Sequence, residues 1–259
     1  MRGDKTAVYR NELGQEVIID NWAILLEKID MTGTTGVHTS EGLAGADGQY
    51  TVESRLGAKT IPCSFAIHGR RCDALVKEWL AQVFSPLLSG VLTVYTKRNK
   101  YSIDVKPQDA PSFERDQTAP YIWRFDVDFV ADFPYWRMGE ELSTGIVQST
   151  TTIVSDCVHE LPLRVYFPVP ASNESMLFVL NGPGFSVSSV LNGVRRDFPI
   201  WVDTKNCTVT DADGNNTNQW VDETAPLNVM KLHYGTNTVG SYLATGYTVY
   251  YYKLSLGEV

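Results

Sequence analysis

The stretch DADGN, residues 211–215, comes closest to a metal-binding loop. Calcium loops place carboxylates and amides before a glycine, because a hard cation takes roughly six to eight oxygen ligands. Here Asp222 stands at the position of the glutamate that would close such a loop, and the flanking segments have strand patterns. Asp, Asn and Gly also tolerate the positive φ of tight turns. We therefore predict a turn and no metal site.

Two acidic residues, Asp126 and Asp128, alternate with apolar residues on one predicted strand. Their Cα atoms would lie about 7 Å apart on the same face of the strand. A glycosidase needs two carboxyl groups on opposite sides of a substrate bond. Side by side on a solvent-facing strand, the two acids are predicted to be solvated or to pair with a neighbouring subunit, and a hydrolase stays an alternative.

The histidines are scattered and complete no known catalytic or zinc motif. His159-Glu160 begins a zinc-protease pattern, but the second histidine is missing and Pro162 would break the required helix. No GxSxG elbow, P-loop or dinucleotide fingerprint occurs. The four histidines are His38, His68, His159 and His233. We predict that the protein is not an enzyme and that it has no catalytic residues, no cofactor and no metal.

Aromatic residues gather in the second half of the chain and could stack on sugar rings. In the tyrosine run 250–252, Tyr250 and Tyr252 share one strand face and Tyr251 takes the other, so at least one face is expected to be core. The candidates for sugar binding are Trp201, Trp220, Tyr242, Tyr247 and Tyr250 to Tyr252.

Composition limits the classes of partner. The chain has 259 residues and a formal charge of −8, and its longest basic runs are Arg70-Arg71 and Arg195-Arg196. These values argue against nucleic-acid recognition and against binding to an anionic membrane. With 43% hydrophobic and 20% charged residues the chain is predicted to fold throughout.

The cysteines and the N-terminal residues indicate folding in a cytosol. The cysteines Cys63, Cys72, Cys157 and Cys207 lie far apart without a CxxC pair, so we expect buried free thiols rather than disulfides or a zinc knuckle. The N-terminus lacks the apolar region of a secretory signal, and no apolar run is long enough to span a membrane.

Strand patterns dominate the first half. Residues 14–20 and 21–29 are expected to form two strands, followed by a Gly/Thr/Ser-rich loop at 31–49 that a partner would order. A strand pair at 50–55 and 59–68 follows, and then a hairpin-like pair at 90–97 and 100–106.

One helix and one long strand are the clearest elements. Residues 71–84 carry an apolar stripe at helical spacing, made of Cys72, Leu75, Val76, Trp79, Leu80 and Val83. From 121 to 133, Tyr121, Trp123, Phe125, Val127, Phe129, Ala131 and Phe133 point one way, and Arg124, Asp126, Asp128 and Asp132 point the other. The lone helix must bury its stripe against a sheet.

Short strand-like segments fill the chain from about residue 146 onward. They are separated by turn residues and predict a sandwich or jelly roll without helices. The segments are 146–154, 161–169, 175–182, 185–194, 198–204, 206–211, 227–235 and 245–256. The stretch GEELSTG, before residue 146, is taken as the domain boundary.

In order along the chain these features resemble the distal tail proteins of long, non-contractile-tailed bacteriophages. The match rests on loose motifs over nearly the whole chain: the strands at 14–29, DGQYTVESRLGAKTIPCSFAIHG at 47–69, the helix followed by LLSGVLTVYTKRNKYSIDV at 87–105, and FVADFPYW at 129–136. In the second half, FPIWVDTKNCTVTDADGNN and LNVMKLHYGTN are similar to that family's segments, with Tyr234 where proline is common.

The resemblance implies a mainly β fold with two domains. Residues 1–140 would be an N-terminal ring-forming belt domain with one helix, and residues 141–259 a C-terminal galectin-like β-sandwich. The protein would form a hexameric ring in the virion tail tip, after synthesis in the bacterial host cytoplasm. Its partners would be the tail tube protein, the end of the tape-measure protein and the tail-associated hub or lysin protein. The alternative is a carbohydrate-binding module that recognises the host cell surface.

Overall fold

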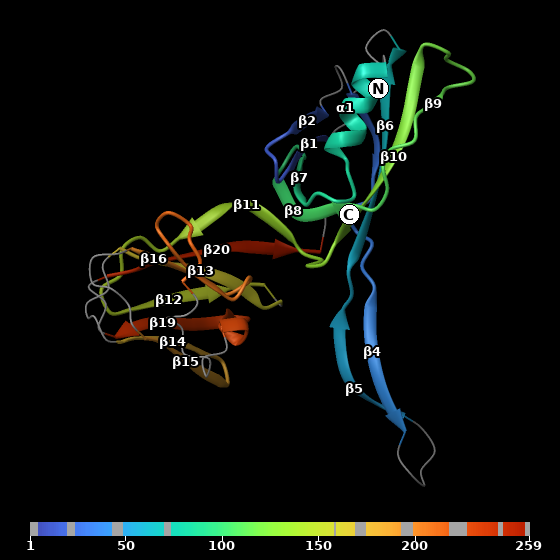
Figure 1. The fold of residues 1–259 in the computed structure, drawn as a ribbon. Coiled ribbons are helices and arrows are strands. Elements are labelled where there is room, and N and C mark those ends of the chain that lie inside the picture. Colours follow the sequence, from blue (N-terminus) through green and yellow to red (C-terminus); the bar gives the residue numbers. More distant parts are fainter. Residues whose placement is uncertain are drawn as a thin grey trace. The chain divides into compact units, whose positions relative to one another are not determined.

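The computed structural model describes residues 5–19, 24–42, 49–69, 74–157, 159–168, 175–192, 199–217, 227–242 and 246–256. The chain divides into two compact units, and each is treated by itself below (Figure 1). Unit 1 comprises Met1–Met138 together with Ser255–Val259, and unit 2 comprises Gly139–Leu254. The division into a ring-forming and a galectin-like domain stays a prediction.

The fold is mainly β, as the sequence predicted. Unit 1 contains β1 (Thr6–Asn11), β2 (Glu16–Ile19), β3 (Ile24–Ile29), β4 (Gly36–Gly42), β5 (Gln49–Leu56), β6 (Lys59–His68), α1 (Ala74–Val83), β7 (Gly90–Tyr95), β8 (Lys100–Pro107), β9 (Glu114–Arg115), β10 (Ile122–Ala131) and the beginning of β11 (Trp136–Ser143). Within it, β2, β1, β7 and β8 pair antiparallel in this order, and β8, β10, β6 and β3 follow in the same way.

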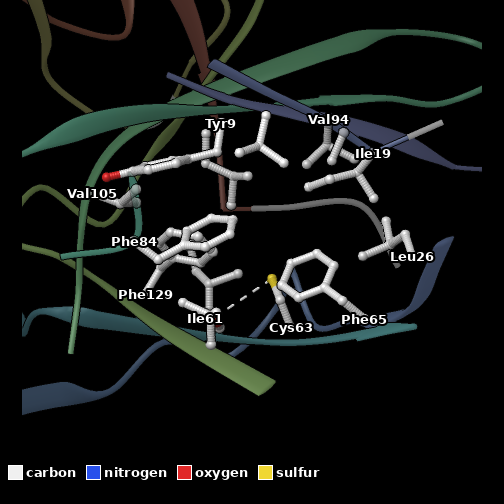
Figure 2. Packing of buried hydrophobic residues seen from close by; sticks show 14 of the residues in the cluster. Tyr9, Ile19, Leu26, Ile61, Cys63, Phe65, Phe84, Val94, Val105 and Phe129 are labelled. Atoms are coloured by element: carbon white, nitrogen blue, oxygen red, sulfur yellow. Dashed lines mark hydrogen bonds between the residues drawn. The ribbon is translucent and has the colours of Figure 1, made fainter. Parts of the chain in front are cut away.

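The core of unit 1 lies between these strands and α1. The rings of Tyr9 and Phe84 stack with centroids 5.2 Å apart, and Phe84 also lies 6.0 Å from Phe129. Figure 2 shows Phe84 between Tyr9 and Ile61. Such aromatic contacts add to the burial of large apolar side chains, so residues from β1, β6, β10 and the end of α1 hold the unit together.

The alternation predicted for 121–133 is confirmed within β10. Phe125, Val127 and Phe129 are buried, whereas Asp126 and Asp128 are exposed. The prediction was wrong at the two ends. Tyr121 is 60% exposed because it precedes the strand in a turn, and Phe133 is only partly buried because β10 ends at Ala131.

The predicted helix is confirmed as α1, but its stripe is narrower than expected. Leu80 and Val83 are buried, whereas Leu75 is 75% exposed and Trp79 is 40% exposed. At about 100° per residue, Leu75 and Trp79 lie on one flank of the helix, outside the arc that faces the sheet. The prediction that they join the core was therefore wrong, and Cys72 lies outside the described residues.

The predicted loop at 31–49 is partly a strand. β4 pairs antiparallel with β5, from Gly36 opposite Leu56 to Gly42 opposite Gln49. Its Gly/Thr/Ser-rich sequence lacks the alternation that a buried face would impose, which is why it was read as a loop. Residues 43–48 lie outside the described residues.

Four further strands had no counterpart in the sequence prediction. They are β1, β9, β11 and β19 (Gly235–Tyr242). β19 contains the stretch GTNTVG, whose glycines and threonines resemble a turn region. It is a central strand nonetheless, because it pairs with β12 on one side and β14 on the other.

Unit 2 is a β-sandwich. Its other elements are β12 (Thr150–Ser155), β13 (Leu161–Phe167), β14 (Ser175–Gly182), β15 (Phe185–Asn192), β16 (Ile200–Asp203), β17 (Thr208–Asp211), the 3-10 helix η3 (Leu227–Val229), β18 (Lys231–Leu232) and β20 (Thr248–Ser255). One layer has the order β17-β16-β13-β20-β11 and the other β12-β19-β14-β15 (Figure 1). Phe167 on β13 packs against Phe178 on β14, with ring centroids 6.1 Å apart, which joins the two layers.

The cysteine prediction was right for two positions and wrong for a third. Cys63 and Cys157 are buried free thiols, and burial raises the pKa of the Cys63 thiol. Cys207 is exposed, in the turn between β16 and β17, where its φ is 53°. A positive φ places it at a tight turn rather than in the core.

Candidate interaction surfaces

The hairpin of β4 and β5, called the arm below, forms a two-stranded sheet of its own. Among the described residues no other strand pairs with either of its edges. At its base the Gly57 amide donates a hydrogen bond to the Thr35 carbonyl, 2.8 Å away. A single hairpin is marginally stable in water, and open strand edges readily pair with another chain. The arm is therefore suited to contact a partner.

The outer face of β3, β6 and β10 carries charged side chains. Arg124 makes ion pairs with Glu27, at 2.9 Å, and with Asp116. Asp116 also accepts hydrogen bonds from the Thr118 hydroxyl and from the Ala119 amide, and these hold the pKa of its carboxyl below the usual range. This network fixes the loop before β10 against the sheet.

Asp126 and Asp128 lie on the same face, opposite Ser64 and Pro62 of β6. No ion pair joins either acid to another residue in the described parts of the chain. Both carboxylates extend from one strand, so they do not face each other across a space where a substrate bond could lie. Their geometry fits solvated acids or an acidic contact for a neighbouring subunit.

An apolar flank lies along α1. Leu75 and Trp79 are one helical turn apart and exposed, and Leu87, just after the helix, is 86% exposed. The turn between β1 and β2 reaches the same region, because the Glu12 amide donates to the Ser89 carbonyl at 2.8 Å. Single exposed apolar residues are ordinary, but neighbouring ones commonly mark a protein contact.

In unit 2, the outer face of the β16-β13-β20 layer carries three aromatic rings around one arginine. Trp201 lies 4.7 Å from Tyr166 and 5.3 Å from Tyr250, measured between ring centroids. The Arg164 guanidinium lies 4.6 Å above the Trp201 ring, and one of its nitrogens is 3.5 Å from Glu141. We call these four residues the aromatic cluster.

The structure brings together only part of the predicted sugar site. Trp201 and Tyr250 meet in the aromatic cluster, but Tyr247 is fully buried, and its hydroxyl donates toward the carbonyls of Val239 and Ser149. Trp220 and the side chain of Tyr242 lie outside the described residues. In the tyrosine run all three tyrosines are partly exposed. Tyr251 lies opposite the buried Leu163 and on the same strand face as the buried Val249, so one face of the run is core, as expected.

The stretch 211–215 is a turn, as predicted. The Asp211 side chain accepts hydrogen bonds from the amides of Asp213, at 3.0 Å, and Asn215, at 2.8 Å, and from the Asn215 side chain. These bonds, that of the Asn215 side chain above all, hold the pKa of the Asp211 carboxyl below its usual range. Gly214 has a φ of +85°, which glycine adopts without strain. The carboxylate oxygens thus serve the turn itself.

The histidines remain dispersed in the fold. The His233 ring packs on Phe185 with centroids 4.0 Å apart, and its Nε2 lies 3.8 Å from Glu160. His68 lies 5.8 Å from the ring of Tyr121. Across the described residues no three His, Cys, Asp or Glu side chains are grouped to hold a metal ion. No helix among them is long and apolar enough to cross a membrane.

Residues 23–131 match the family described as the phage tail protein RIFT-related domain. The matched residues run from β3 to β10 and therefore include the arm and α1. No curated protein matches the sequence.

Solved structures share the fold well beyond the RIFT-related domain. The Dit protein of phage SPP1, described as a paradigm of the hub adsorption apparatus of phages that infect Gram-positive bacteria, has a TM-score of 0.69 at 10% identity, over 96% of this chain and 99% of that one. A chain of the phage P2 baseplate in its activated conformation with Ca has a TM-score of 0.62 at 8% identity, over 98% and 99%. A chain of the same baseplate with Sr has a TM-score of 0.63 at 9% identity, over 99% of this chain and 100% of that one.

The RIFT-related domain and the shared fold confirm the resemblance to distal tail proteins predicted from the sequence. At these low identities the structural likeness concerns the fold alone. Two residues of the aromatic cluster, Arg164 and Tyr166, were absent from the sequence-based candidates. Their alternation with the buried Leu163 and Val165 could have placed them on the outer face of β13.

Proposed function

We propose that this protein is a structural ring subunit of a phage tail tip. Six copies would form a hexameric ring that connects the tail tube to the tail-tip hub and adsorption apparatus. The observation that carries the proposal is the arm, a two-stranded sheet without a partner strand among the described residues of its own chain. In a ring, each arm would be ordered by the neighbouring copy.

Ring closure requires two different surfaces on each subunit, since a head-to-tail interface repeats around the axis. The arm supplies a surface of backbone hydrogen-bonding groups, and the flank of α1 supplies an apolar surface. The outer face of β10, with Asp126 and Asp128, supplies an acidic one. Because each copy carries a formal charge of −8, contacts between copies would have to rely on apolar and backbone interactions or on matched charges.

The ring would act as an adaptor rather than as an enzyme. Its partners would be the tail tube protein, the end of the tape-measure protein and the tail-associated hub or lysin protein. The mature protein would be located in the virion, after synthesis in the cytoplasm of the bacterial host. The fold shared with a hub adsorption protein and with baseplate chains supports this assignment.

The arm offers a sharp test of the proposal. Gly36 faces Leu56 and Val37 faces Arg55, so replacing residues 38–54 with Asn-Gly would close a short hairpin on the same two pairs. The core residues of unit 1 that the structure describes all lie outside the replaced segment. We expect the shortened protein to keep its circular dichroism and melting temperature but to lose the ring mass in light scattering. A shortened protein that assembles like the complete chain would contradict the role of the arm.

Carbohydrate binding is the second candidate, and the aromatic cluster is the observation that favours it. Tyr and Trp rings can stack on sugars, and Arg164 with Glu141 offers a donor and an acceptor beside them. A glycan array and cell-wall pull-down with the complete protein, repeated with Trp201→Ala and Tyr250→Ala, tests this. Binding that both substitutions abolish would support it, and equal binding by all three proteins would count against this site.

A further inference from the structure

Lys59, the first residue of β6, is a fully buried lysine. Lysine is almost never completely buried unless its charge is compensated. No ion pair among the described residues involves its ammonium group. Its hydrogen bonds therefore go to neutral oxygens, and the Asp30 carboxylate acts on it only through its charge.

Two oxygens surround the Lys59 ammonium. Its Nζ donates a hydrogen bond to the carbonyl of Leu256, and it lies 3.5 Å from Oγ1 of Thr34. Leu256 directly follows β20, and Thr34 stands two residues before β4. One buried side chain thus joins the base of the arm to the C-terminal end of the chain.

The base of the arm consists of residues 30–37 and 55–62, called the arm root below. Besides the pairing of Gly57 with Thr35, the Asp30 amide donates to the Pro62 carbonyl at 3.2 Å. The indole Nε1 of Trp136 donates to the Met31 carbonyl at 3.1 Å. The arm root is therefore a hydrogen-bonded junction with Lys59 at its centre.

We propose that Lys59 is a positioning residue that ties the arm root to the C-terminal segment Ser255–Leu256. The order of the arm then depends on the last residue of β20 and on the residue directly after it. The dependence is mutual, because the Leu256 carbonyl compensates the buried ammonium and the ammonium holds Leu256 in place. Without Leu256, the ammonium would lose its main acceptor and the arm root would have to open to water.

Hydrogen exchange of the full protein measures this coupling. In Lys59→Met, and in a chain ending at Leu254, we expect amides of the arm root to exchange about tenfold faster, the size of effect expected for losing a hydrogen bond to a charged donor. Peptides from β7, β8 and β10 should keep their protection. Lys28→Met, at an exposed position on β3, is the matched control and should change nothing.

A chain ending at Leu256 refines the test. It keeps the acceptor and turns it into a carboxylate beside Lys59, so the arm root should exchange no faster than in the complete protein. In a Lys59→Met chain ending at Leu254, the two changes remove the same contact, so their effects should not add.

Unchanged exchange in both single variants, additive effects in the double variant, or equal loss of protection across β7, β8 and β10 would overturn the proposal. The role of Lys59 in assembly rests on the proposed ring. The exchange measurement tests the contact between Lys59 and Leu256 whether or not a ring forms. A protein that never forms rings and still shows this coupling would refute the ring alone.

Discussion

The indole of Trp136 donates its hydrogen bond to the carbonyl of Met31, 3.1 Å away, and both residues are buried. The bond links the beginning of β11 to the segment that leads from β3 to the arm. A buried carbonyl without a donor is costly, so this single contact fixes where the chain leaves the sheet.

Trp136→Phe should lower the free energy of unfolding of unit 1 by about 1–3 kcal/mol, because the Met31 carbonyl loses its donor while most of the packing remains. Urea denaturation followed by circular dichroism measures the change. Trp79→Phe is the control, since Trp79 is 40% exposed, and it should change stability by less than about 0.5 kcal/mol. Equal effects of the two substitutions would contradict the assigned role of Trp136.

Removal of a tyrosine hydroxyl should have opposite effects in the two units. The buried Tyr9 hydroxyl has no hydrogen-bond partner among the described residues, so Tyr9→Phe should leave the stability of unit 1 unchanged or raise it by about 1 kcal/mol. The Tyr247 hydroxyl lies 2.8 Å from the Val239 carbonyl, and Tyr247→Phe should destabilise unit 2 by about 1–2 kcal/mol. Differential scanning calorimetry of the two variants measures both changes in stability. A Tyr9→Phe protein less stable than the natural one would refute the prediction for unit 1.

The pH dependence of stability should reveal Lys59. Burial lowers the pKa of Lys59 from 10.5 to about 8, and Asp30 opposes this shift only in part. Between about pH 8 and pH 10.5 the unfolded chain therefore binds more protons at this position, so the Lys59 contribution to stability rises with pH. Burial also raises the pKa of Tyr9 and of Tyr247 to about 12, which works in the opposite direction above pH 10.

The measurable quantity is the difference in unfolding free energy between the natural protein and Lys59→Met at pH 7, 8, 9 and 10. It should shift in favour of the natural protein as the pH rises, by up to about 3 kcal/mol. Lys28→Met again serves as the control. A difference that stays constant with pH would mean that Lys59 titrates as an ordinary exposed lysine.

The double substitution Leu75→Ser and Trp79→Ser tests the apolar flank of α1. Both side chains are exposed, so the melting temperature should change little, whereas assembly should weaken at least about tenfold if a neighbouring copy covers them. Sedimentation velocity over a range of concentrations measures assembly. Val154→Ser, at a 69% exposed position of unit 2, is the control and should assemble normally.

Strand β10 shows what the sequence could predict. One of its faces is buried against Phe65 and Phe84 and the other faces solvent, so apolar and acidic residues must alternate. The helix α1 was predictable in the same way, but the width of its buried arc depends on how closely it approaches the sheet. The positions of Leu75 and Trp79 on its exposed flank could not be derived from periodicity alone.

The arm and the aromatic cluster show what escaped the sequence. β4 is held by backbone pairing with β5, not by burial, so no hydrophobic period marks it. In the cluster, Arg164, Trp201 and Tyr250 come from three strands that lie far apart in the chain. Their meeting depends on non-local strand pairing, which alternation within each strand does not reveal.

Light scattering after size exclusion of the complete protein, with negative-stain images of the same peak, tests the central claim most directly. The account predicts a mass of about six chains and ring-shaped particles, since closed rings need a heterologous interface that repeats. A monomer at high concentration that forms no ring when the neighbouring tail proteins are added would contradict it.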